Sequence, residues 1–234
     1  MRDERLAAHP GTEAERRRHV ADYHGMISLL DAQVGRVQEA LSACGRDRDT
    51  IVVYTADHGL ALGQHGLLGK QDLYDRRVRV PLLPAGPGLP ADGRRADGLH
   101  HAYDLLPTLC ALAGVPSPDG IDGRSLLSLI AGRPASARPF VHAPYRDVPR
   151  MACDGRWKPI RHYRSGGGRG TERLQLFDLA ADPWEMRDLA ARCGEQVARL
   201  AAELVRWQRE VGDPLWRSCR DPRATARGPQ VPMR

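Results

Sequence analysis

The hydrophobic positions at the start of the chain predict one long amphipathic helix. Apolar side chains recur at intervals of three and four, which is the period of a helix with a narrow apolar stripe. The stripe consists of Val20, Tyr23, Ile27, Leu30, Val34, Val37 and Leu41. We therefore expect a helix over residues 12–43, ended by Gly45. The heptad spacing also suits a coiled coil, but a strand follows at once, so packing of the stripe on a sheet is favoured.

The pattern then changes from periodic to continuous. Residues 51–56 form an apolar run with β-branched and aromatic side chains, which is typical of a strand buried on both faces of a parallel sheet. A second strand is expected near residues 79–83. Two helices should follow, over residues 104–114, with Asp104 as the cap, and over residues 124–131.

Beyond a proline-marked boundary at residues 134–139, short segments alternate between apolar and polar side chains. Such alternation predicts a small antiparallel sheet. The expected strands are residues 140–144, 150–153, 157–163 and 174–179. A last helix over residues 195–211 would pack Val197, Leu200 and Leu204 inward.

These elements together predict an α/β fold in three parts. Residues 1–135 would form an α/β domain, residues 136–213 a small α+β subdomain, and residues 214–234 a disordered tail rich in arginine and proline. In an open α/β sheet, ligands bind outside the carboxyl ends of the strands. The first part is therefore where chemistry is expected.

Composition narrows the choice of partners. The chain has 35 basic and 29 acidic residues, and its net charge of +6 favours anionic partners. The surplus lies at Arg16–Arg18 and in the tail without a nucleic-acid motif, so no nucleic-acid partner is expected. No apolar run is long enough to cross a membrane and Met1–Glu4 does not resemble a signal peptide, which favours a cytoplasmic location. The five cysteines lack C-x-x-C spacing and fit reduced thiols.

Candidate chemistry lies directly after the first strand. Asp57 and His58 would stand at its carboxyl end, and Lys70 follows at the end of a loop punctuated by glycine. A carboxylate and an imidazole can face a cation, while a lysine suits sulfate or phosphate oxygens. On spacing alone, a plain turn in which Asp57 bonds its own backbone is the favoured explanation of the pair.

A resemblance to a known family adds weight to the chemical interpretation. From about Asp22 to Ala190 the chain resembles the second half of a type I sulfatase of the alkaline phosphatase superfamily. The order of the segments matches as well as their content. The segments concerned are Met26–Val37, Asp57–Gly59, Gly63–Gly66, Gly69–Lys70, Val78–Leu82, Asp104–Leu109, Leu112–Pro116, Asp122–Leu126, Leu176–Leu179 and Asp182–Glu185.

The resemblance implies a fold and a set of site residues. It implies an alkaline-phosphatase-like sheet with flanking helices, incomplete at its amino end, plus a small antiparallel sheet with a packed helix. Asp57 and His58 match metal ligands, with Ca²⁺ favoured over Mg²⁺, although His58 could instead donate a hydrogen bond to the substrate. Lys70 matches the lysine that contacts sulfate. His65 is weighed between a structural loop residue and a proton donor.

One departure from the family limits the expected activity. These sulfatases make their formylglycine nucleophile in a C/S-x-P/A-x-R motif, and no such motif stands ahead of Asp57; Cys219–Arg223 has its proline one place too late. We therefore expect the carboxyl-terminal portion of a metal-dependent sulfate ester hydrolase, inactive as this fragment. The alternatives are a phosphonate monoester or phosphodiester hydrolase of the same superfamily, or a non-catalytic remnant. Expected partners are an anionic sulfate or phosphate ester, and either a complementing amino-terminal segment or a second copy.

Overall fold

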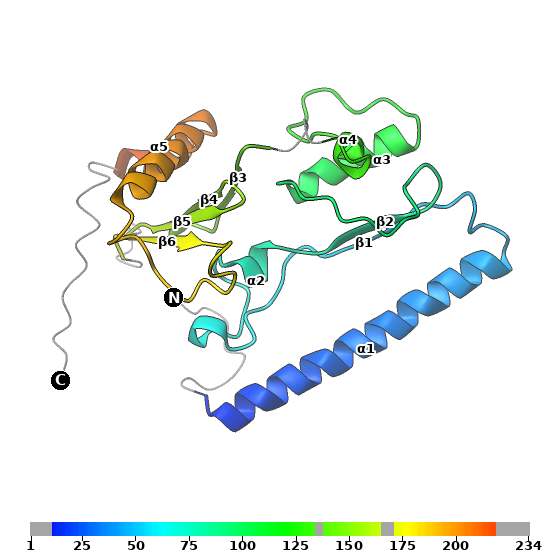
Figure 1. Ribbon diagram of the computed structural model, residues 1–234, viewed down its shortest axis with the longest axis horizontal. Helices are drawn as coiled ribbons and strands as arrows, with labels where there is room; N and C mark the ends of the chain where they lie inside the picture. The colour runs from blue at the N-terminus through cyan, green and yellow to red at the C-terminus, as the bar shows by residue number, and fades with distance from the viewer. Residues whose placement is uncertain (1–10, 134–137, 165–170, 219–234) are drawn as a thin grey trace.

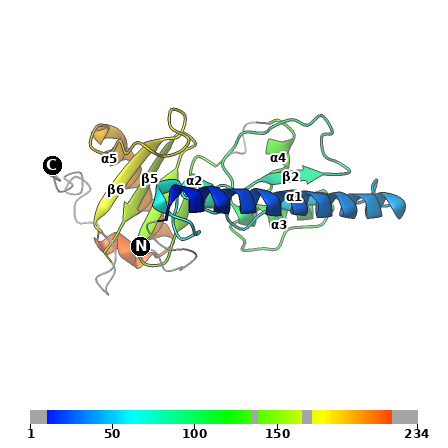
Figure 2. The same ribbon diagram turned by 90° about the horizontal axis from the view of Figure 1, so that it is seen from below.

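A computed structural model describes residues 11–133, 138–164 and 171–218. The C-terminal sheet and its helix lie at one end of the molecule, the first two strands with α3 and α4 lie at the other, and α2 lies between them (Figures 1 and 2). The elements are α1 (Glu13–Ala43), β1 (Val52–Thr55), the 3-10 helix η1 (Gln64–Gly66), α2 (Asp75–Val78), β2 (Leu82–Ala85), η2 (Ala102–Asp104), α3 (Leu105–Leu112), α4 (Leu127–Ile130), β3 (Val141–Pro144), β4 (Pro149–Cys153), β5 (Trp157–His162), β6 (Arg173–Asp178), α5 (Gly194–Glu210) and η4 (Pro214–Ser218).

The long helix α1 has the limits that its local signals predict. Thr12 caps its start: the Glu15 backbone N–H donates to Thr12 Oγ1 at 3.2 Å, and the Glu15 carboxylate accepts from the Thr12 N–H at 2.7 Å. Gly45 follows its end with a φ of 68°, and the Arg46 N–H donates to the Leu41 carbonyl at 2.8 Å. This is a Schellman ending, which needs the left-handed conformation that glycine adopts freely.

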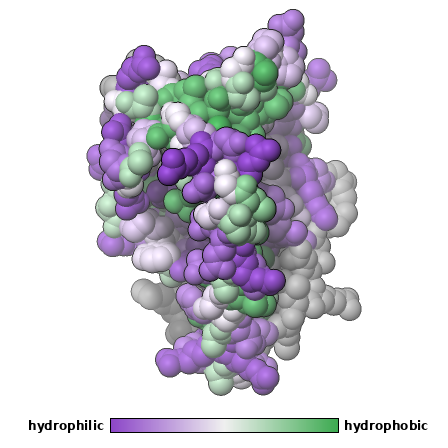
Figure 3. All heavy atoms as spheres, turned by 90° about the vertical axis from the view of Figure 1, so that its right-hand side faces the viewer, coloured by the Kyte–Doolittle hydropathy of each residue, from purple (hydrophilic) through white to green (hydrophobic). Residues whose placement is uncertain are grey.

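The apolar stripe of α1 does not find the partner that its pattern predicts. No residue of α1 is buried, and Ile27, Leu30 and Val37 are 44%, 47% and 58% exposed. In Figure 1 the helix runs alongside β1 and β2 rather than being covered by them. Figure 3 shows hydrophobic surface open to solvent on the side opposite the C-terminal sheet. A long exposed stripe of this kind is typical of a surface that another polypeptide covers.

The first two strands pair differently from the prediction. β1 and β2 are antiparallel, with Val52 opposite Ala85 and Thr55 opposite Leu82, so the expected parallel arrangement is wrong for the described residues. The connection between them contains only the short helices η1 and α2, whereas a parallel pairing usually returns through a longer crossover helix packed on the sheet. β2 also begins later than predicted, because residues 75–78 form α2 and Pro81 cannot donate to a ladder.

The C-terminal sheet agrees with the prediction. β3, β4, β5 and β6 are neighbours in that order and all antiparallel. One face packs against α5 through buried side chains, and the other packs against the segment around α2. The first cluster includes Leu174, Leu176, Val197, Leu200 and Ala201, and the second includes Leu73, Met151, Ile160 and Phe177. The sheet is therefore a base on which the segment around α2 rests.

Several shorter predictions need correction. The two expected middle helices are shorter than predicted, as α3 and α4. Residues 214–218, placed in the predicted tail, form η4, where the Leu215 N–H donates to Asp213 Oδ1 at 3.1 Å; residues 219–234 lie outside the described part. Within the described residues all cysteines are free thiols, and no helix is long and apolar enough to cross a membrane.

Candidate functional site

Three of the four predicted site residues lie together where β1 ends. Lys70 Nζ is 2.8 Å from His58 Nε2, which in turn is 3.3 Å from Asp57 Oδ2. Lys70 reaches this point through the loop that includes η1, which brings residues 12 positions apart into contact. The side chain of Asp57 is 85% exposed and that of His58 is 34% exposed. The cluster is thus open to solvent on the side of Asp57.

The hydrogen bonds of His58 indicate which of its ring nitrogens accepts and which donates. An ammonium can only donate, so His58 Nε2 accepts from Lys70. His58 Nδ1 then carries the proton and donates to the Gly59 carbonyl at 3.2 Å. The His58 backbone N–H also donates to Asp57 Oδ1 at 2.9 Å, which is the turn contact considered from the sequence. The turn and the chemical cluster therefore occur together.

The same cluster gives only part of a cation site. Among the residues that the structure describes, no group of three or more His, Cys, Asp or Glu side chains could hold a metal ion. Ca²⁺ takes six to eight oxygen ligands and Mg²⁺ near-octahedral ones, as a general rule. Asp57 offers one suitable carboxylate, whereas His58 Nε2 already accepts from Lys70. The assignment of both residues as metal ligands stays a prediction that needs donors from elsewhere.

His65 lies apart from these three residues. It sits in η1 with a φ of 54°, and its ring stacks on Tyr74 with centroids 3.9 Å apart. Burial, followed by the nearby Arg77 charge, lowers the pKa of His65. The ring is not among the described side chains that line the cavity beside Asp57. Its contacts support the structural alternative over the proton donor.

A cavity of about 700 Å³ opens beside the cluster. Asp57, His58 and Lys70 line one part of it, and the other lining residues come from α2, β3, β4 and the segments next to them, including residues 100–105. The sequence reasoning missed several charged or titratable side chains in its wall. They are Asp72, Asp75, Arg77, His101 and Arg146. No periodicity or motif marks these residues, because distant parts of the chain bring them together.

Arg79 belongs to the cavity wall as well, although the sequence places it in a supporting strand. It follows α2 and precedes β2, and its side chain is 76% exposed. Arg77, two residues earlier, is 1% exposed and is paired with Asp72 at 2.8 Å. Burial raises the pKa of Asp72, since the buried carboxylate loses solvent while Arg77 opposes the shift. The two arginines thus differ: one is a buried structural cation, and the other faces solvent at the site.

A close backbone contact joins the cluster to α2. The Gly59 N–H donates to the Arg77 carbonyl at 2.9 Å, directly after His58. A Cβ atom on residue 59 would lie 2.0 Å from the Arg76 carbonyl oxygen, a distance that no side chain can occupy. Glycine is therefore required at this approach of the two segments.

We predict that Gly59→Ala lowers the free energy of unfolding by about 1–3 kcal/mol or more, because α2 must move away from the site. Gly35→Ala is the control, since no atom lies within 4 Å of that position in α1, and it should stabilise the chain by up to about 1 kcal/mol. Urea unfolding of both variants provides the measurement. Equal effects of the two substitutions would contradict the close approach.

Acid should weaken the fold through His101 in the cavity wall. Burial, and then the charge of Arg138, lowers the pKa of His101 from 6.5 to about 4. The unfolded chain therefore binds the extra proton first, so the stability is complete above about pH 6.5 and falls as the pH drops towards 4. Allowing for partial solvent exposure, we expect a loss on the order of 1–2 kcal/mol from this residue. Unfolding measured between pH 7 and pH 4 should show a smaller loss in His101→Asn, and an identical loss would contradict the assignment.

Comparisons with known sequences agree with one another. The family model described as N-sulphoglucosamine sulphohydrolase, C-terminal, matches residues 63–210, and the model described as Sulfatase matches residues 3–115. The delta 4,5-hexuronate-2-O-sulfatase of Bacteroides thetaiotaomicron is 34% identical, covering 79% of this chain and 39% of that protein. Arylsulfatase K of Bos taurus is 31% identical, covering 82% and 37%. The choline-sulfatase of Rhizobium meliloti is 34% identical, covering 76% and 34%.

Solved structures give the same picture for the fold. A putative sulfatase from Bacteroides thetaiotaomicron superposes with a TM-score of 0.76 at 31% identity, covering 92% of this chain and 48% of that one. The phosphonate monoester hydrolase of Agrobacterium radiobacter superposes with a TM-score of 0.63 at 29% identity, covering 84% and 40%. The chain spans less than half the length of each of these relatives.

Proposed function

Because the chain belongs to the sulfatase family and corresponds to the carboxyl-terminal portion of its alkaline-phosphatase-like fold, we propose that it forms one wall of a site that hydrolyses a sulfate ester. The observation that carries this proposal is the contact between Lys70 and His58 beside the exposed Asp57. Lys70 can bind an anion and Asp57 can bind a cation, and both side chains line the cavity. A cavity with charged groups in its wall is the kind of site that binds a sulfated ligand.

Each of the three side chains has a distinct role in this proposal. Lys70 donates to an oxygen of the sulfate group, a charge-assisted contact that contributes about 1.5–3 kcal/mol. His58 holds the ammonium of Lys70 through Nε2, a contact that favours this role over metal ligation. Asp57 contributes one oxygen to a Ca²⁺ or Mg²⁺ site that ligands outside the described residues complete. Such an ion would draw negative charge from the sulfate oxygens.

The nucleophile comes from outside this sequence in our proposal. The printed sequence has no C/S-x-P/A-x-R motif from which a formylglycine could be made. A site that binds the sulfate group but lacks the nucleophile can bind its ligand without hydrolysing it. We therefore propose that the 234-residue chain alone is inactive.

The open surface of the chain supports a partner polypeptide. The stripe of α1 is exposed at Ile27, Leu30 and Val37, and in the described part of the chain β1 and β2 form a sheet of two strands. A two-stranded sheet is marginally stable by itself, and its unpaired edges invite another strand. A complementing segment of the same family would cover both features.

We predict that the isolated chain associates with itself when no such segment is present. Sedimentation velocity at micromolar concentration should show dimers or larger species, because the apolar stripe remains in contact with water. Ile27→Glu combined with Leu30→Glu should reduce this association. A monodisperse monomer that unfolds cooperatively would count against the prediction.

A second candidate is a phosphonate monoester or phosphodiester hydrolase. The similarity to the Agrobacterium radiobacter phosphonate monoester hydrolase supports it, at a lower TM-score than that of the sulfatase neighbour. Lys70 and Asp57 would suit phosphate oxygens as well as sulfate oxygens, because both anions are tetrahedral and negatively charged.

A fusion separates these candidates. The chain would replace the matching carboxyl-terminal part of the Rhizobium meliloti choline-sulfatase, and the product would be assayed with a sulfate ester and a phosphonate ester in parallel. We expect hydrolysis of the sulfate ester to exceed that of the phosphonate, and Lys70→Ala to reduce it by at least about tenfold. Arg18→Ala, on the exposed side of α1, is the control and should change nothing.

The other outcomes each point to a different function. Preference for the phosphonate would favour the second candidate. A folded fusion that cleaves neither ester would favour a non-catalytic remnant. Sulfate hydrolysis that persists in full after Lys70→Ala would remove this site from the reaction.

A further inference from the structure

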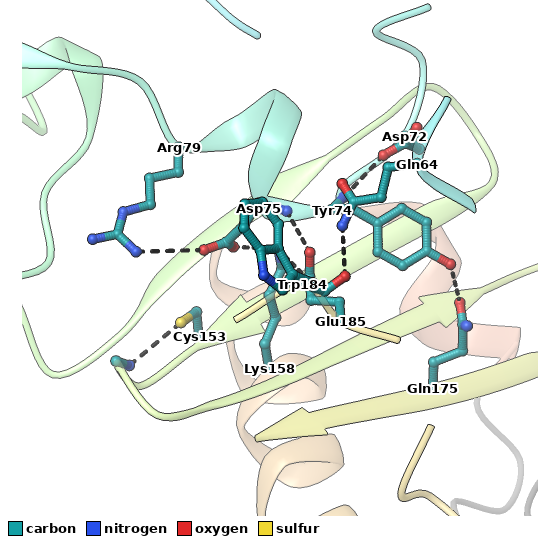
Figure 4. Close-up of polar contacts among 11 residues, drawn as sticks. Gln64, Asp72, Tyr74, Asp75, Arg79, Cys153, Lys158, Gln175, Trp184 and Glu185 are labelled. Atoms are coloured by element: carbon teal, nitrogen blue, oxygen red, sulfur yellow. Dashed lines mark hydrogen bonds and ion pairs between the residues drawn. The ribbon is translucent and has the colours of Figure 1, made fainter. Parts of the chain in front are cut away.

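A buried lysine lies beneath α2, on the face of the C-terminal sheet that supports it. Lys158 belongs to β5, and its side chain is 0% exposed. Its Nζ is 2.6 Å from Asp75 Oδ1 in α2 and 2.8 Å from Glu185 Oε1, as Figure 4 shows. A charged group held out of water is costly unless it is fully paired, and removal of one partner leaves the others uncompensated. Glu185 is only 1% exposed, so it is a buried partner of this ion pair.

The second oxygen of Glu185 acts on α2 directly. Glu185 Oε2 accepts the backbone N–H of Asp75 at 2.7 Å, so it satisfies the first free donor of the helix. Glu185 has a φ of 56°, an unusual backbone conformation for a residue other than glycine. Burial raises the pKa of Glu185, while the ammonium of Lys158 opposes the shift. The Lys158 ammonium and the Asp75 N–H thus both stabilise the ionised carboxylate of Glu185.

Further contacts join the same two segments. The Tyr74 hydroxyl donates to Gln175 Oε1 of β6 at 3.0 Å. Gln64 Nε2 donates to the Trp184 carbonyl, next to Glu185. Arg76 lies over the ring of Trp184 at 4.6 Å from its centroid. The segment from η1 to α2 is thus held both to β6 and to the chain that follows β6 (Figure 4).

A short path leads from this cluster to the candidate site. Asp75 begins α2, and two residues later the Arg77 carbonyl accepts the Gly59 N–H at 2.9 Å. Gly59 follows His58, whose imidazole holds Lys70. Since a side chain on residue 59 would collide with α2, the two segments are in close backbone contact.

We propose that Lys158, paired with Asp75 and Glu185, is a positioning residue that fixes α2 and through Gly59 sets the placement of His58 and Lys70. The expected effect on sulfate binding rests on the proposed function. The link from Lys158 through α2 to Gly59, called the mechanical link below, does not. Lys158 touches no ligand in this account. It acts on the site from the opposite side of α2.

Amide hydrogen exchange of the full chain tests the link at Gly59. Lys158→Met should speed exchange of the Gly59 amide by about 100-fold relative to the amides of β4 and β5, because Asp75 and Glu185 lose the buried ammonium that holds them together beneath α2. Lys158→Arg, which keeps the charge, should restore most of the protection. If Lys158→Met does not fold, Glu185→Gln should give a smaller increase, of about tenfold, because it weakens the same pair.

Arg161→Met is the matched control. Arg161 is another buried cation of β5, 2% exposed, and it lies three residues from Lys158 and so on the other face of the sheet. Its loss should alter the overall stability without changing the relative exchange of Gly59. An effect on Gly59 equal to that of Lys158→Met, or no effect of either Lys158→Met or Glu185→Gln, would overturn the proposal.

Titration with inorganic sulfate separates this inference from the proposed function. If wild-type chain binds sulfate and Lys158→Met binds it at least about tenfold more weakly, both are supported. If the Gly59 amide exchanges faster in Lys158→Met while sulfate affinity is unchanged, Lys158 does not position the site. If the wild type binds no sulfate but Gly59 loosens in Lys158→Met, the mechanical link stands and the proposed function fails.

Discussion

Purified chain is expected to release no phenol from an aryl sulfate above the rate measured without protein. Lys70, the proposed anion contact, and the carboxylate of Asp57 are present, but the sequence holds no residue in the formylglycine motif. Members of a catalytic group act as a unit, and loss of one removes most of the acceleration, which for whole enzymes is on the order of 10⁶-fold or more. Positioning alone would leave only a small residual rate.

The assay needs an enzyme that works under the same conditions. The choline-sulfatase of Rhizobium meliloti, assayed with its own ester, provides that control. Added Ca²⁺ or Mg²⁺ should not restore turnover to the chain, because the missing group is the nucleophile. Hydrolysis that exceeds background and disappears in Asp57→Ala would show that this chain contains a complete site.

Asp104→Ala is expected to destabilise the fold strongly. Asp104 is 0% exposed and was predicted only as a helix cap. Its carboxylate accepts from Arg138 Nε at 3.0 Å and from Arg138 Nη2, and also from the backbone N–H groups of His101 and Arg124, each at 2.8 Å. It therefore ties η2 to two later segments of the chain.

These donors stabilise the ionised carboxylate of Asp104. Burial by itself would raise the pKa of Asp104, but the hydrogen bonds from Arg138 and the two backbone groups outweigh it, and the pKa is lowered. The stability from this group is therefore present above the unfolded value of 3.8 and is lost as the pH falls through the lower folded value. At neutral pH the full contribution is available.

Removal of one partner of a buried ion pair generally costs about 3–5 kcal/mol, and we expect a loss of that size for Asp104→Ala. Asp92→Ala is the matched control, because Asp92 also pairs with an arginine but is 51% exposed, and it should cost about 0–1 kcal/mol. Urea unfolding at pH 7 measures both. Similar losses for the two variants would mean that Asp104 does not hold the segments together.

The parts of the fold that could be predicted depend on local signals. Thr12 and Gly45 fixed the limits of α1, since both act on backbone groups within four residues. Alternating side chains located the four strands of the C-terminal sheet. The pairing of β1 with β2 could not be predicted in this way, because direction depends on the connection and not on the apolar run itself.

The same distinction between local and distant signals applies to the site residues. Asp57, His58 and Lys70 lie within one loop and form a recognisable order in the sequence, and the structure brings them together. Lys158 and Asp75 are 83 positions apart, and nothing in the neighbouring sequence of either one marks the other. Buried charges of this kind contradict hydrophobic patterning, so a sequence reading assigns them to the surface.

The central claim is that Asp57, His58 and Lys70 form the anion-binding wall of a sulfatase site. Its most direct test is an inorganic sulfate titration of the isotopically labelled chain at low ionic strength, followed by amide chemical shifts. We predict shifts centred on residues 57–59 and on Lys70, with affinity reduced at least about tenfold in Lys70→Ala. Shifts centred instead on Arg16–Arg18, with equal affinity in Lys70→Ala, would contradict the claim.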